Sequence, residues 1–147
     1  MNKRYLMLPI LAGLVVVGCQ SMKGTIVPPG TVFRACNGSC DVEVKVSGNC
    51  MDQDQVDAVN GDLEVKQRNT KITWVITTPG YEFVGGAGIT IHHGSGQFKS
   101  SFNPQQPQRF SMHDKKDVDG DFKYSVRVKP TGSTFSCWEY DPTIRNN

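Results

Sequence analysis

The sequence lacks an excess of charge of either sign. Among its 147 residues, 16 are Lys or Arg and 14 are Asp or Glu. Lys3 and Arg4 lie in the first eighteen residues, which contain no acidic residue, so the remaining chain holds 16 − 2 = 14 basic and 14 acidic residues. A balanced chain has no general electrostatic attraction for nucleic acid, so we expect no nucleic-acid partner.

The chain also lacks two patterns of apolar residues. No segment of about 11 residues repeats its apolar positions with the 3.6-residue period of a helix. No stretch after Val17 is apolar enough to span a bilayer, which takes about 20 residues. With the short length, these absences disfavour a polytopic membrane protein and a multidomain enzyme, and they favour a single domain.

The beginning of the chain has the pattern of an export signal. Met1 to Arg4 is short and positive, and Leu6 to Val17 is predominantly apolar. As a helix, the apolar run would span about 18 Å, which is too short for a hydrocarbon core of about 30 Å. We therefore predict a signal peptide over residues 1–18, a tether over 19–35 and one folded domain over 36–147.

The end of this signal resembles the lipobox of bacterial lipoproteins. Val16-Val17-Gly18-Cys19 carries the resemblance, with Val16 where the family most often has Leu. The resemblance implies that Cys19 becomes the lipidated amino terminus, and Gln20 implies sorting to the outer membrane, facing the periplasm. Two or more acyl chains anchor a protein stably. An ordinary cleaved signal that leaves a free thiol at Cys19 is the alternative.

The rest of the chain alternates apolar and polar residues with the period of two that is typical of strands. Gly, Asn, Asp and Pro separate these runs, as expected for turns. Many short strands with regular turns predict an all-β fold, a single antiparallel β-sandwich. The expected strands are residues 40–47, 63–66, 72–77, 81–84, 89–92, 110–112 and 121–129, with a last short piece over 134–138.

Three of these runs resemble the strand pattern of cupredoxin-like sandwiches. They are residues 72–76, residues 80–83 and residues 122–126. Blue copper needs two His and a Cys thiolate, whereas Val126 stands where the family has its Cys. The resemblance therefore implies the scaffold, cupredoxin-like or immunoglobulin-like, without the copper ligands and without electron transfer.

Four cysteines remain once Cys19 is set aside. An even number in an exported domain favours disulfides over free thiols. Cys40 starts a predicted strand and Cys50 follows its far end, so these two are too far apart to bond. Of the three pairings that four cysteines allow, we expect Cys50–Cys137 and Cys36–Cys40. The Cys-x-x-x-Cys spacing of residues 36–40 leaves a zinc or copper site as the alternative.

Other candidate metal ligands lie in turns and loops. His92 and His93 are adjacent to a glycine-rich turn, and His113 is a possible third ligand. Successive side chains on a strand point to opposite faces, so the two adjacent histidines converge only if the backbone bends. Alternate carboxylates at Asp117, Asp119 and Asp121 are spaced as in calcium loops, although they lack the EF-hand order. Ordinary turn and surface residues are the simpler interpretation of both groups.

The sequence also lacks the motif Gly-x-Ser-x-Gly of a serine nucleophile. We therefore expect a protein without enzymatic activity and without a cofactor: a lipid-anchored binding or accessory module of the cell envelope, with an envelope protein or glycan as its partner. Residues 85–97 and 102–121 are the expected recognition loops, because loops on a rigid sandwich usually carry recognition. A copper-, zinc- or calcium-binding protein and an envelope hydrolase are the alternatives.

Overall fold

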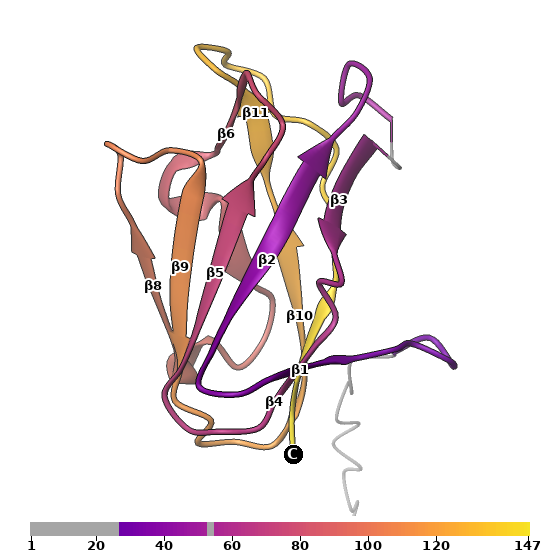
Figure 1. Cartoon of the computed structure of the whole chain (residues 1–147), viewed down its shortest axis with the longest axis vertical. Helices are drawn as coiled ribbons and strands as arrows, with labels where there is room; N and C mark the ends of the chain where they lie inside the picture. Colours follow the sequence, from indigo (N-terminus) through magenta and orange to yellow (C-terminus); the bar gives the residue numbers. More distant parts are fainter. Residues whose placement is uncertain (1–26, 53–54) are drawn as a thin grey trace, which may run out of the picture.

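The structure, a computed structural model, describes residues 27–52 and 55–147. It consists of two five-stranded sheets packed face to face, with a separate two-stranded sheet beside them (Figure 1). The predicted all-β sandwich is confirmed. Within the described part of the chain, no helix has the length and apolar character needed to cross a membrane. The predicted signal, Cys19 and the first part of the tether, residues 19–26, lie outside the described residues and stay predictions.

Each sheet joins strands from distant parts of the sequence. Six of the strand pairings are antiparallel and three are parallel. The first sheet has the strand order β1 (Arg34–Cys36), β4 (Leu63–Val65), β12 (Thr143–Asn146), β10 (Gly120–Val126) and β7 (Ile89–Ile91). The second sheet has the strand order β3 (Val56–Val59), β2 (Ser39–Val46), β5 (Thr70–Ile76), β9 (Arg109–Asp114) and β8 (Phe98–Phe102). In the two-stranded sheet, β11 (Val128–Pro130) pairs with β6 (Tyr81–Phe83).

The alternation read from the sequence sets which side chains enter the core. On β2, Val42, Val44 and Val46 are buried, and the residues between them are exposed or partly exposed. Central strand β5 is buried on both faces for part of its length, since Thr73 is buried between Ile72 and Trp74. A half-buried strand and a more central one are the outcomes that these two patterns predict.

Two expected strands differ from the observed ones. The run from Asp121 to Lys129 is not one strand: after Val126 the chain leaves the first sheet, and β11 pairs with β6 instead. Residues 134–138 form no strand, and the last strand is β12, further along the chain. Pairing partners decide both outcomes. Residues Val128 to Pro130 pair with β6, and β12 is held between β10 and β4.

Trp74 on β5 and Tyr124 on β10 connect the two sheets through the core. Both side chains are fully buried, and their rings meet edge to face with centroids 5.3 Å apart. The Trp74 indole donates to the Tyr124 hydroxyl at 3.3 Å, and that hydroxyl donates to the carbonyl of Gly61 at 2.7 Å. Burial raises the pKa of Tyr124. Gly61 permits this close approach, because a Cβ there would lie 2.8 Å from Ala58 and 3.0 Å from the hydroxyl.

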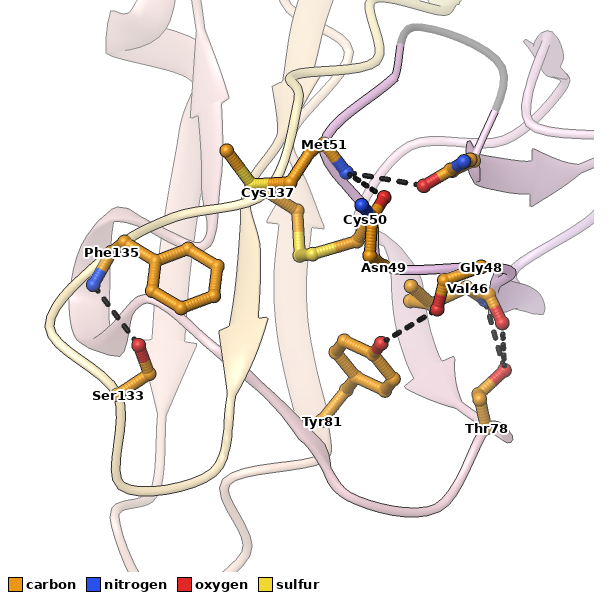
Figure 2. The surroundings of a disulfide bond; sticks show 11 residues. Val46, Gly48, Asn49, Cys50, Met51, Thr78, Tyr81, Ser133, Phe135 and Cys137 are labelled. Carbon is orange, nitrogen blue, oxygen red and sulfur yellow. Dashed lines mark hydrogen bonds between the residues drawn. A yellow bond between two sulfur atoms is a disulfide. The ribbon is translucent and has the colours of Figure 1, made fainter.

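The four cysteines form the two predicted disulfides, Cys36–Cys40 and Cys50–Cys137. The second joins residues 87 apart in the sequence and ties the turn after β2 to the C-terminal segment (Figure 2). Backbone hydrogen bonds support the same connection, since Trp138 N donates to Cys50 O at 3.0 Å and Cys137 N donates to Val128 O at 2.8 Å. The C-terminal segment is therefore fixed although it contains no strand between β11 and β12.

Replacing Tyr124 by Phe tests the buried link. We expect Tyr124→Phe to lower the free energy of unfolding by about 1–3 kcal/mol, because the Gly61 carbonyl and the Trp74 indole lose their common partner inside the core. Tyr81→Phe is the matched control: its hydroxyl is exposed and lies 3.5 Å from Gly48 O, so a change within about 0.5 kcal/mol is expected. Urea unfolding of the three proteins measures both values, and equal losses would contradict the central role of Tyr124.

Candidate functional site

The two segments predicted to carry recognition meet at a pocket. Neither is a loop throughout, because β7 lies in one and β9 in the other. Their remaining parts form a pocket of about 310 Å³, which is near the lower limit for sites that bind small molecules. We call it the Val118 pocket; it is lined by Gly94, Gly96, Gln97, Asp117, Val118 and Phe122.

Gln97 organises the wall of the Val118 pocket. It ends the short 3₁₀ helix η3 (Ser95–Gln97), and its side chain is buried. The Gln97 Oε1 accepts from the backbone N–H groups of Asp117 at 3.0 Å and Val118 at 3.2 Å. The Nε2 of the same amide has no hydrogen-bond partner among the described residues. The oxygen of this buried amide therefore fixes the backbone of Asp117 and Val118 at the pocket wall.

Phe122 forms part of the apolar wall. Its ring packs edge to face on Phe98, with centroids 5.2 Å apart. Gly94 has a φ of +72°, and a Cβ there would lie 2.5 Å from the Phe122 ring. Only glycine combines this backbone conformation with so close a contact.

A second group of polar side chains lies on the outer face of the first sheet. We call it the polar cluster; it consists of His92, Ser125, Arg127, Glu139 and Asp141. Ser125 on β10 and Arg127, which directly follows this strand, alternate with the buried Tyr124, Val126 and Val128. His92 follows β7, which pairs with β10. The cluster therefore joins three segments that are far apart in the sequence.

The C-terminal segment brings its two carboxylates to the cluster. Tyr140 forms an isolated antiparallel bridge with Val126. Glu139 and Asp141 flank Tyr140, so their side chains lie on the face opposite to its own. The backbone pairing of one residue thus places both acids over β10.

Close contacts order the polar cluster. Ser125 Oγ, which is fully buried, donates to Asp141 Oδ1 at 2.8 Å and also contacts His92 Nε2. Arg127 Nε donates to Glu139 Oε2 at 2.5 Å. Burial works against ionisation of Glu139, but the hydrogen bond from Arg127 and the positive charge of its guanidinium outweigh burial and lower the pKa of this carboxyl. Glu139 is therefore an anion at neutral pH.

The structure does not bring the predicted metal ligands together into one group. His93 is exposed on the turn after β7, and His113 is exposed on β9 in the other sheet. Asp117 pairs with Arg68 at 2.8 Å, and Asp121 makes two hydrogen bonds to Arg145 at 2.7 and 2.9 Å. Asp119 is exposed. Of the predicted ligands in the described part of the chain, only His92 belongs to a group of three metal-ligating side chains that converge.

Glu139 and Asp141 are the members of the cluster that the sequence did not reveal. They follow Cys137 in a segment without a strand, so no alternation of apolar residues marks their direction. Their one signal is the pattern Glu-x-Asp, which places both carboxylates on one side of an extended chain.

The polar cluster does not have the geometry of a hydrolytic triad. In a triad, one ring nitrogen of His contacts the serine and the other contacts the acid. Here His92 Nε2 is the atom that contacts Ser125, and the same atom lies 3.7 Å from Asp141 and 4.0 Å from Glu139. An imidazole nitrogen and two carboxylate oxygens that approach one another in this way resemble the ligands around a cation.

Comparisons with models of protein families and with curated proteins find no match for this chain.

Asp114, close to the Val118 pocket, gives a testable dependence on pH. It is fully buried, and burial raises its pKa although Lys116 N donates to its Oδ1 at 2.8 Å. The nearby Lys116 charge lowers this pKa and the Asp117 charge raises it. Because the folded protein holds the proton more tightly than the unfolded chain, the contribution of Asp114 to stability is fully present below about pH 4 and is lost as pH rises.

We therefore expect Asp114→Asn to be more stable than the original protein at pH 7, with an advantage that shrinks towards pH 4. Asn keeps the oxygen that accepts from Lys116 and carries no charge. Thermal unfolding between pH 4 and 7 measures the effect, with Asp119→Asn as an exposed control that should show no such trend. A stability advantage that does not change with pH would contradict the raised pKa of Asp114.

Proposed function

We propose that the protein is a lipid-anchored protein of the bacterial cell envelope that acts as a non-enzymatic binding module. The export signal and the lipobox resemblance at Cys19 support the anchoring. Two disulfides in the folded domain agree with an oxidising compartment outside the cytoplasm. The cupredoxin-like strand pattern supports a scaffold on which loops present the recognition surface.

The observation that carries the binding role is the Val118 pocket. Two segments that are separate in the sequence build it, and its walls combine the apolar Val118 and Phe122 with Asp117. A partner that inserts a small apolar group would match these features. A smaller hollow of about 240 Å³ beside Phe102 and Pro104 lies within the same two segments and adjoins β6 and β11.

Metal binding is the second candidate function, and the polar cluster favours it. The hydrolase alternative receives no comparable support. Ser125 is buried, and the same atom, His92 Nε2, lies near Ser125, Glu139 and Asp141, whereas a triad uses both ring nitrogens.

Lipidation is tested by its chemistry. Cells grown with a clickable palmitate analogue should label the original protein, and Cys19→Ser should carry no label, because the thioether needs the sulfur. The double variant Cys36→Ser/Cys40→Ser removes two other sulfurs and should keep the label. An unlabelled original protein, or label that persists in Cys19→Ser, would contradict the anchor.

Recognition at the Val118 pocket is tested by photo-crosslinking in intact cells. A photoreactive phenylalanine in place of Val118, which is 59% exposed, should form a discrete adduct with the partner. The same residue in place of Val32, which is 85% exposed and lies outside the pocket, should not form that adduct. No adduct at position 118, or the same adducts at both positions, would contradict recognition by this pocket.

A pair of glycine variants sharpens this experiment. Gly96 and Gly86 both lie in short 3₁₀ helices, and an added Cβ meets open space at each. Gly96 lines the Val118 pocket and Gly86 does not. We expect Gly96→Val to lower the adduct yield about tenfold, the effect of losing about 1.4 kcal/mol of contact, and Gly86→Val to leave it unchanged.

A further inference from the structure

The polar cluster contains the one group of three metal-ligating side chains that converge within the described residues. One ligand atom each from His92, Glu139 and Asp141 lies within 4.8 Å of the other two. His92 Nε2 is 3.7 Å from Asp141 Oδ1 and 4.0 Å from Glu139 Oε1. Ligand atoms about 2.1 Å from a tetrahedral ion are about 3.4 Å apart, so these separations would have to shorten by about 0.3 to 1.4 Å to close the shell.

The carboxylate oxygens of Glu139 and Asp141 differ in the hydrogen bonds that they already accept. Arg127 holds Glu139 Oε2, which leaves Oε1 facing His92. Ser125 donates to Asp141 Oδ1, and a carboxylate oxygen that accepts one hydrogen bond still has a free lone pair. Ser125 and Arg127 therefore orient the two carboxylates from outside the ligand shell, as residues around metal ligands commonly do.

Charge also favours a cation at this position. Two carboxylates face each other, and one guanidinium pairs with one of them; Lys123 Nζ contacts only the backbone carbonyl of Asp141, at 3.1 Å. A divalent ion between the carboxylates would remove their mutual repulsion. The His92, Glu139 and Asp141 side chains are 34%, 34% and 50% exposed, so water can complete the coordination.

From this geometry we infer that His92, Glu139 and Asp141 form a binding site for a divalent transition-metal ion, with zinc as the ion that fits best. An imidazole with two carboxylates is a ligand set that zinc accepts with a water in the fourth position. Calcium takes six to eight oxygen ligands, and this cluster offers too few. The site does not depend on lipidation or on the Val118 pocket.

Binding requires a defined change at His92. The Nε2 atom gives its lone pair to the ion, so the ring carries its proton on Nδ1. The contact between Nε2 and Ser125 Oγ then loosens, while the Ser125 hydroxyl keeps its bond to Asp141. Ser125 is thus a positioning residue and not a ligand.

Calorimetric titration of the purified full-length protein with zinc chloride tests the site. We expect one zinc ion per chain, and His92→Ala and Glu139→Gln should each weaken binding at least about tenfold. Ser125→Ala should weaken it by about 10–100-fold, the usual effect of losing a residue that orients a ligand. Cobalt(II) should give the visible absorption of a four-coordinate ion in the original protein and not in His92→Ala.

Controls separate this site from incidental binding. The double variant His93→Ala/His113→Ala keeps the proposed ligands and should bind zinc as the original protein does. A Cys19→Ser form, titrated in parallel, removes that sulfur as a ligand. Calcium should give no saturable binding at the same concentrations. Unfolding midpoints of the metal-free variants establish that each is folded.

Three results would overturn the inference. One is the absence of stoichiometric zinc binding by the original protein. Another is equal binding by a folded His92→Ala. The third is a loss caused by the His93→Ala/His113→Ala variant, which would identify surface histidines as the ligands. Because no partner is present in these titrations, failure here leaves the test of the Val118 pocket unaffected.

Discussion

The register of strand β10 is the constraint on which both the core and the polar cluster depend. Its inward residues include Tyr124, which binds Trp74 and Gly61 inside the sandwich. Its outward residue Ser125 orients Asp141, and Arg127, directly after the strand, orients Glu139. A slip of one residue would exchange the two faces of the strand, placing the hydroxyphenyl group outside and the Ser125 hydroxyl on the core face. The buried tyrosine network therefore fixes the position of the surface cluster as well as the packing of the sheets.

The long disulfide extends this order to the C-terminal segment. Residues 137–141 belong to no strand, and they carry both acids of the cluster. The Cys50–Cys137 bond holds one end of this segment and the bridge between Tyr140 and Val126 holds the other. In the loop-entropy description, closing 87 residues stabilises the fold by about 4–5 kcal/mol, whereas the short Cys36–Cys40 loop contributes about 2 kcal/mol.

Sequence patterns predicted what depends on local alternation and missed what depends on distant partners. The alternating run of β2, the central strand β5 and the cysteine pairing could be inferred from spacing alone. Strands β1, β3, β8 and β12 were not predicted, because pairing with segments distant in the sequence stabilises them. For the same reason His92 could be named as a ligand from sequence, whereas Glu139 and Asp141 needed the folded chain to bring them to it.

The ion pair of the polar cluster contributes little to the free energy of unfolding. The side chains of the Arg127–Glu139 ion pair are 41% and 34% exposed, and pairs of this kind contribute about 0–1 kcal/mol. Two carboxylates at the outer limit of 4.8 Å repel by about 0.9 kcal/mol even in bulk water, which offsets most of that gain. By contrast, removing one partner from the buried Trp74–Tyr124 link costs about 1–3 kcal/mol. An arrangement that orders two like charges beside an imidazole is one that a divalent cation would complete.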